Sequence, residues 1–225
     1  MTRGRHRSPI LDPGDVGLKF NDLPKWEGCA LDPSSLFAGT SNRMEIEVGS
    51  GKGTFLVQQA HLQPNTFFLG IEWAGEFFRH AADRVRRHQL KNVKLLHDDA
   101  SEFIKHRCSA STVDAVHCYF TDPWPKKRHH KRRFLQDSTL HALYRVLREG
   151  GGIHLVTDHV ALWEWYESQS EKHASLFARE PFQSPDSAQE GEVIGTNFER
   201  KYRVAGRPFH AMSLRRKQGE GPDVP

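Results

Sequence analysis

An α/β domain with a doubly wound, mostly parallel sheet is the fold that this sequence predicts. From Arg43 onward, short apolar or β-branched runs alternate with longer amphipathic stretches, which is the pattern of strands joined by crossover helices. The chain has 225 residues, 37% hydrophobic and 27% charged, so that one domain can bury a substantial core. A glycine cluster directly follows the first strong apolar run, where such sheets bind ligands.

The expected elements follow from residue type and spacing. Strands are expected at 44–48, 66–72, 92–97, 113–120, 152–157 and 209–214. Apolar residues at helical spacing predict helices, in which Phe78, Ala82 and Val85 form one buried face and Leu140, Leu143, Tyr144 and Leu147 another. We expect a variable leader over residues 1–42, a single domain over 43–217 and a disordered tail over 218–225.

Composition argues against several classes of protein. No apolar run approaches the roughly 20 residues of a membrane helix, and the first ten residues lack the apolar stretch of a secretory signal. A soluble, cytoplasmic monomer without an obligate partner subunit is expected. The cysteines Cys29, Cys108 and Cys118 lack CxxC spacing, and the histidines form no HExxH pattern, so neither disulfides nor a metal site is expected.

A glycine loop follows the first expected strand. Gly49, Gly51 and Gly53 have GxGxG spacing and precede a helical stretch, so that backbone amides and a helix N-terminus face the strand ends. Thr54 stands where the dinucleotide fingerprint has its third glycine, and Gly53 follows Lys52 where the Walker pattern needs Ser or Thr. The loop therefore favours a ligand that is not held by its phosphates.

Three acids lie at or near the ends of successive expected strands. Glu47 lies in the first, Glu72 closes the second, where it can accept hydrogen bonds from ribose hydroxyls, and Asp99 follows the third, where it can meet an adenine amino group. Their combined negative charge suits a cation such as a sulfonium better than a pyrophosphate. Taken singly, each acid is more often a surface or capping residue, and it is the ordered set at the strand ends that favours binding.

A proline-containing loop follows the fourth expected strand. The sequence Asp122-Pro-Trp124-Pro-Lys126 cannot continue as helix or central strand. Asp122 can bind N–H groups of a base and Trp124 can stack on one. The alternative is a simple turn whose tryptophan packs on the core.

A basic run, KKRHHKRR, occupies residues 126–133. Its six permanent cations create a local field suited to nucleic-acid phosphates, whereas an isolated basic run is more often a solvated surface. We expect Lys126 to reach the target nucleotide and the distal cations to contact backbone phosphates. These distal cations are Arg128, Lys131, Arg132 and Arg133.

Together these motifs resemble those of a known family. EVGSGKG, GIE, DDA, DPWPKKRHHKRR, Thr157-Asp158 and the T-x-F-E segment at 196–199 occur in the order found in bacterial tRNA (guanine-N7-)-methyltransferases. The resemblance spans about residues 45–201 and implies a Rossmann-like, seven-stranded class I methyltransferase sheet. It also implies methyl transfer from S-adenosylmethionine to N7 of a guanosine in the tRNA variable loop, at position 46, forming 7-methylguanosine.

The resemblance also implies roles for particular residues. Asp122 would be the catalytic residue and would line the donor site. The other donor-site residues would be Glu47, Gly49, Gly51, Gly53, Glu72 and Asp99. The guanosine would be contacted by Lys126, Asp158, Thr196, Asn197, Phe198 and Glu199.

Other functions remain open at this point. Another RNA or DNA base methyltransferase, such as one acting on adenine N6, is an alternative because a D-P-aromatic loop also suits that chemistry. A nucleotide-binding oxidoreductase is disfavoured by the GxGxG spacing and the basic run. A catalytically silent RNA-binding protein would require that donor binding is absent.

Overall fold

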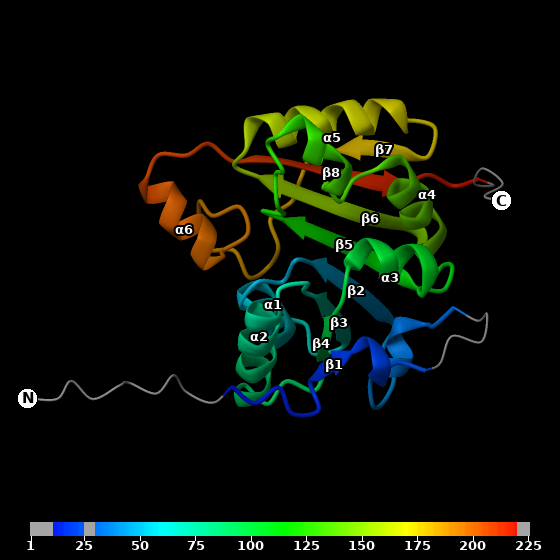
Figure 1. Ribbon diagram of the computed structural model, residues 1–225, viewed down its shortest axis with the longest axis vertical. Coiled ribbons are helices and arrows are strands. Elements are labelled where there is room, and N and C mark those ends of the chain that lie inside the picture. The colour runs from blue at the N-terminus through cyan, green and yellow to red at the C-terminus, as the bar shows by residue number, and fades with distance from the viewer. Residues whose placement is uncertain (1–10, 25–29, 220–225) are drawn as a thin grey trace, which may run out of the picture.

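The computed structural model describes residues 11–24 and 30–219. Its strands form one sheet in the order β1-β4-β3-β2-β5-β6-β8-β7 (Figure 1). All neighbouring strands are parallel except β8, which is antiparallel to β6 and β7. The strands are β1 (Gly17–Lys19), β2 (Arg43–Val48), β3 (Thr66–Ile71), β4 (Val93–His97), β5 (Val113–Tyr119), β6 (Leu147–Thr157), β7 (Phe177–Glu180) and β8 (His210–Arg216).

The sequence predicted the fold class correctly but not the number of strands. All six expected strands are present, and β2 to β8 make up the expected seven-stranded sheet. An eighth strand, β1, comes from the leader and pairs with β4. Leu147, expected on a helix face, instead begins β6.

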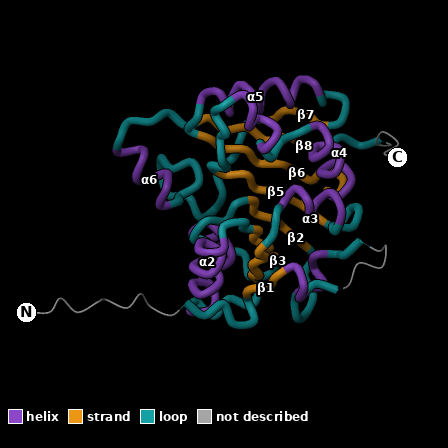
Figure 2. Tube along the Cα trace, in the orientation of Figure 1, coloured by secondary structure: helices purple, strands orange, loops and turns teal. Residues whose placement is uncertain are grey.

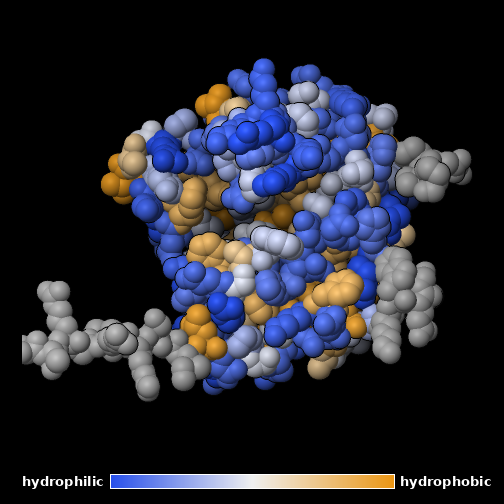
Figure 3. Space-filling model, viewed as in Figure 1, coloured by the Kyte–Doolittle hydropathy of each residue, from blue (hydrophilic) through white to orange (hydrophobic). Residues whose placement is uncertain are grey.

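Helices cover both faces of the sheet (Figures 1 and 2). On one face lie α1 (Thr54–Leu62) and α2 (Gly75–Arg87), and on the other lie α3 (Ala100–His106), α4 (Asp137–Val146) and α5 (Val160–Lys172). The last helix, α6 (Asn197–Val204), stands beyond the body of the sheet. The space-filling view shows that the surface over α5 is mostly hydrophilic (Figure 3).

The side chains of β2 show how the sheet divides the core. Met44, Ile46 and Val48 belong to the cluster that contains the apolar residues of α3, α4 and α5. The alternation of side chains along a strand sends Glu45 and Glu47 to the opposite face, and both are buried. A pair of buried acids in a central strand is unusual, which makes this face a candidate for function.

Several expectations concern residues outside the described part of the chain. Cys108 and Cys118 are buried free thiols, whereas Cys29 lies outside the described residues, as do most of the expected tail and the first ten residues of the expected leader. No described helix is long and apolar enough to cross a membrane.

Candidate functional site

The glycine loop connects β2 to α1 with all three glycines at positive φ. A Cβ built on Gly51 would meet no atom of the described chain within 4 Å, whereas one on Gly53 would lie 3.1 Å from Cβ of Ala81 in α2. Gly51 therefore borders open space, and Gly53 permits close packing of the loop against α2. The loop combines room for a ligand with a fixed position at the carboxyl edge of the sheet.

Glu72 ties the end of β3 to the glycine loop. Its carboxylate accepts a hydrogen bond from the backbone N–H of Gly51 at 2.8 Å and another from Ala74 at 2.8 Å. Burial raises the pKa of Glu72, and the negative charge of Asp122 acts in the same direction. Two bonds occupy about half of the lone pairs of a carboxylate, so the remainder can accept from a ligand.

Glu47 is a buried carboxyl group whose Oε2 has no hydrogen-bond partner among the described residues. Burial raises the pKa of Glu47 to about 8, and the nearby Glu72 adds to the shift. Buried polar atoms are nearly always paired in native proteins. A cationic ligand group placed beside this unpaired acid would favour its ionised form, so Glu47 fits the binding of such a group.

Asp99 lies at the end of β4, as predicted, and caps α3. Its Oδ1 accepts from the backbone N–H groups of Ser101 at 2.7 Å and Glu102 at 3.2 Å. The capping role considered as an alternative is therefore real for this oxygen. A donor contact would use the second oxygen.

The proline-containing loop places Asp122 near Glu72. Asp122 is exposed and lies close enough to Glu72 to affect its pKa. Phe120 (φ 53°) and Trp124 (φ 43°) on either side adopt left-handed backbone conformations, which are rare for bulky residues. Asp122 is thus presented to solvent on a tightly turned segment at the same edge as the glycine loop.

The basic run forms a 3-10 helix, η3 (Lys127–Arg132). Lys126 and the cations of η3 are exposed, and the Arg132 guanidinium lies 4.9 Å from the ring centroid of Trp124. The expectation that Arg133 contacts phosphates is wrong, because its side chain is only 3% exposed and its Nε donates to the carbonyl oxygen of Pro123 at 3.0 Å. Of the four distal cations expected to contact phosphates, the exposed ones are Arg128, Lys131 and Arg132.

The T-x-F-E segment begins α6 and lies beside the proline-containing loop. The hydroxyl oxygen of Thr196 caps the helix by accepting from the N–H of Glu199 at 3.2 Å. The ring of Phe198 lies 4.6 Å from that of Phe120, and Asn197 is exposed. Segments far apart in the sequence therefore meet at Phe120, two residues before Asp122.

The structure gives Glu199 an internal role. This side chain is 0% exposed, and its carboxylate accepts hydrogen bonds from three successive backbone N–H groups, those of Val193, Ile194 and Gly195, at 2.5–2.8 Å. It offers no accessible oxygen to a base in this arrangement. The expected direct contact of Glu199 with guanosine stays a prediction, and the observed bonds support a role in shaping the preceding loop.

Asp158 follows β6 and is paired with Arg207, whose guanidinium donates to its carboxylate at 2.6 Å. Arg207 also lies 3.9 Å from the ring centroid of Tyr202 in α6. An Asp158 contact with guanosine would therefore share or replace an existing ion pair. Sequence reasoning missed Arg207 because no local pattern marks a partner 49 residues away.

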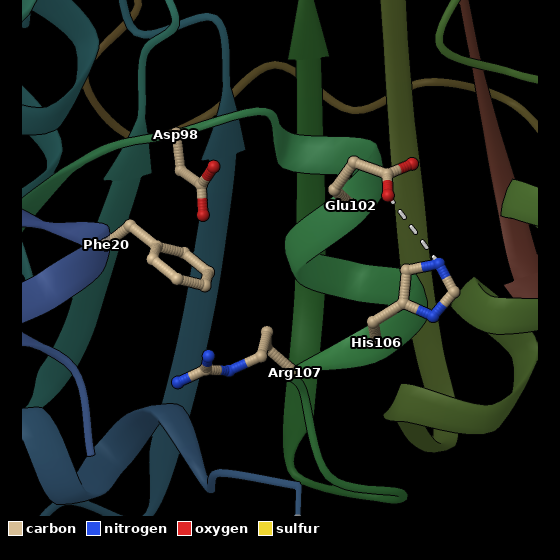
Figure 4. A pocket seen from close by; sticks show the side chains of 5 residues that line it. All are labelled: Phe20, Asp98, Glu102, His106 and Arg107. Carbon is tan, nitrogen blue, oxygen red and sulfur yellow. Dashed lines mark ion pairs between the residues drawn. The ribbon is translucent and has the colours of Figure 1, made fainter. Parts of the chain in front are cut away.

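A cavity of about 370 Å³ lies between η1 (Phe20–Asp22) and α3. Figure 4 shows the ring of Phe20 between Asp98 and Arg107, with Glu102 and His106 on the neighbouring helix. None of the residues expected to bind donor or guanosine lines this cavity. The candidate site is thus the edge formed by the glycine loop, the acids and the Asp122 loop.

Comparisons with known proteins identify the family to which this chain belongs. Residues 41–212 match a family model described as "Putative methyltransferase". The tRNA (guanine-N(7)-)-methyltransferase of Rhodopirellula baltica is 34% identical over 95% of this chain and 79% of its own length. That of Magnetococcus marinus is 34% identical over 96% and 87%, and that of Bacillus subtilis 33% over 78% and 82%.

Solved structures of other methyltransferases share the fold. The 16S rRNA methyltransferase KamB has a TM-score of 0.57 at 14% identity, covering 80% of this chain and 89% of its own. The aminoglycoside resistance methyltransferase NpmB1 has a TM-score of 0.54 at 18% identity, covering 79% and 89%. The structural likeness establishes the class I methyltransferase architecture, and the sequence matches establish the rest: this chain belongs to the family of tRNA (guanine-N7-)-methyltransferases.

Proposed function

We propose that this protein transfers a methyl group from S-adenosylmethionine to N7 of a guanosine in the variable loop of tRNA, at position 46. The observation that carries the proposal is the meeting of an open glycine loop, two buried acids and the exposed Asp122 at one edge of the sheet, next to a basic helix. The names of the relatives support the same substrate. The proposed enzyme acts as a single chain in the cytoplasm.

The residues present fit the methyl donor. S-adenosylmethionine supplies an electrophilic methyl group on a positively charged sulfur. The unpaired Oε2 of Glu47 suits a cationic group, the free lone pairs of Glu72 suit ribose hydroxyls, and the second oxygen of Asp99 suits an amino group. Open space at Gly49 and Gly51 leaves room for the donor against the backbone.

The chemistry at guanine requires positioning more than proton transfer. N7 carries an in-plane lone pair and no proton, so its attack needs no general base. Positive charge grows on the purine during transfer, and the carboxylate of Asp122 would stabilise it. Lys126, Asp158, Thr196, Asn197 and Phe198 are proposed to hold the nucleotide, which must be displaced from the folded RNA into the site.

The product identifies the reaction. Unmodified tRNA incubated with labelled S-adenosylmethionine should yield 7-methylguanosine on nucleoside analysis, and borohydride followed by aniline should cut the treated tRNA at one guanosine. Label recovered as N6-methyladenine would refute the proposal. We expect EDTA to leave the rate unchanged, and a rate abolished by EDTA and restored by added metal would contradict a metal-free mechanism.

Glu72→Ala should weaken binding of S-adenosylmethionine by roughly ten- to a hundredfold, because a charge-assisted hydrogen bond contributes roughly 1.5–3 kcal/mol. The variant also removes the acceptor that holds the Gly51 amide. Titration calorimetry measures the affinity. Glu76→Ala, which removes an exposed acid from the first turn of α2, is the control. Equal affinities for S-adenosylmethionine in the two variants would show that Glu72 does not belong to the donor site.

Arg128→Gln combined with Lys131→Gln should weaken tRNA binding and reduce its dependence on salt, because each lost phosphate contact lowers the slope of log K against log salt by about 0.7–0.9. Turnover at saturating tRNA should persist. Filter binding at several salt concentrations measures the slope. Lys91→Gln with Lys172→Gln, two exposed lysines outside η3, is the control. An unchanged slope in the first pair would exclude η3 as the RNA surface.

Lys126→Ala should act differently from the distal changes. Lys126 directly follows the proline-containing loop and is exposed beside Asp122, so its loss should lower turnover even when tRNA is saturating. Single-turnover assays measure this step. A loss that disappears at saturating tRNA would place Lys126 among the general phosphate contacts.

A further inference from the structure

The loop that carries Asp122 has an unfavourable backbone conformation at two residues. Both Phe120 and Trp124 lie in the left-handed region, with φ of 53° and 43°. An unfavourable backbone conformation of this kind persists only where the surroundings enforce it. The contacts that enforce it also decide where the Asp122 carboxylate points.

Two buried side chains form hydrogen bonds to the residues on either side of Asp122. On one side, the hydroxyl groups of Thr121 and Tyr166 lie 2.9 Å apart. On the other, Nε of Arg133 donates to the carbonyl oxygen of Pro123 at 3.0 Å. Thr121 and Pro123 are the immediate chain neighbours of Asp122, so these two hydrogen bonds restrict the backbone motion of Asp122.

The side chains of Tyr166 and Arg133 both lie in the protein interior. Tyr166 projects from α5 and is only 1% exposed, and burial raises its pKa, so that its hydroxyl stays protonated. The guanidinium of Arg133 lies 5.4 Å from the ring centroid of Trp165, also in α5. A shift of the loop would leave a buried hydroxyl and a buried cation without these hydrogen-bond partners, which is unfavourable in the protein interior.

We infer that Tyr166 and Arg133 are positioning residues that fix the Asp122 carboxylate for methyl transfer. Neither touches the substrate in this role. Arg133 belongs to the basic run by sequence but to the catalytic loop by contact. The inference rests on the proposed function, because it assigns these residues to the same reaction.

Tyr166→Phe tests the contact between Tyr166 and Thr121 by removing a single hydroxyl. We expect kcat to fall about three- to tenfold, the equivalent of one neutral hydrogen bond, with unchanged KM for tRNA and S-adenosylmethionine. Tyr144→Phe is the matched control, because the buried Tyr144 hydroxyl donates to the carbonyl oxygen of Gly219, away from the loop. Thr121→Val added to Tyr166→Phe should cause no further loss, since the two hydroxyls serve one contact.

Arg133→Gln tests whether Arg133 positions the loop through its hydrogen bond to Pro123 or binds RNA. We expect lower kcat with an unchanged salt slope of tRNA binding, the reverse of the change expected for Arg128 and Lys131. A reduced salt slope with normal kcat would overturn the assignment of Arg133. A wild-type kcat in Tyr166→Phe, or an equal loss in Tyr144→Phe, would overturn that of Tyr166.

Amide hydrogen exchange at the start of the loop tests these side-chain contacts without any substrate. The N–H of Phe120, which donates to the carbonyl oxygen of Val156 at 2.8 Å, should exchange faster in Tyr166→Phe than in wild type, and at the wild-type rate in Tyr144→Phe. Unchanged exchange in Tyr166→Phe would overturn the inference. If the wild-type protein failed to methylate tRNA, the proposed function would be refuted, while exchange would still decide whether Tyr166 holds the loop.

Discussion

Asp122→Asn should lower turnover by about 10²–10³-fold while the affinity for S-adenosylmethionine changes little. The amide has nearly the shape of the carboxylate but no charge, so it cannot offset the positive charge that grows on the purine. Removing one preorganised electrostatic contact to a transition state typically has an effect of about this size. Because Asp122 is exposed on a loop that other residues hold, the substitution should leave the fold intact.

Single-turnover rates and donor titrations on the same preparation measure the two effects of Asp122→Asn separately. Asp137→Asn is a suitable control, because Asp137 is an exposed acid at the start of α4 with its own lysine partner. Equal losses of rate and donor affinity would make Asp122 a binding residue. A rate close to that of wild type would remove it from the chemistry.

Glu47→Gln should stabilise the free protein at alkaline pH and weaken its binding of the donor. The pKa of Glu47 is raised from 4.5 to about 8 by burial. Below pH 4.5 the group is protonated in both the folded and the unfolded state. Between pH 4.5 and 8 only the folded state keeps the proton, so the free energy of unfolding falls as pH rises, by about 3–5 kcal/mol in total.

Glutamine keeps the size of Glu47 but cannot ionise, so the variant should lack this loss. Urea unfolding at pH 5, 7 and 9 should give nearly equal stabilities at pH 5 and a growing advantage for Glu47→Gln above it. Because only the ionised form attracts a cation, the affinity of the wild type for S-adenosylmethionine should rise with pH up to about 8, and that of the variant should not. Parallel pH profiles for the two proteins would show that Glu47 does not titrate in this range.

The sequence predicted the central sheet and the position of the glycine loop, because both depend on local signals. Strand alternation and helical spacing located β2 to β6 and β8, and the glycine spacing located the loop after β2. Asp122 could be placed at the same edge because parallel strands end together. The family resemblance added the chemistry, which spacing alone left open between several ligands.

The sequence could not show what depends on distant partners. Arg133 looks like its neighbours in the basic run, and only the fold shows that it is buried beneath Pro123. Glu199 looks like a base-binding acid, and only the fold shows three backbone amides around it. Strand β1 is three residues long and pairs with a strand far along the chain, so no local pattern marks it.

The two borders of the sheet bear on how the protein behaves at high concentration. The outermost strands, β1 and β7, have three and four residues and are the shortest described. An open strand edge presents unpaired N–H and C=O groups, on which another molecule can extend the sheet. Here the long apolar strands lie inside, and β7 carries Arg179 and Glu180 at its rim. Within the described residues the borders of the sheet are therefore short and carry charged side chains, which disfavours edge-to-edge polymerisation of the folded protein.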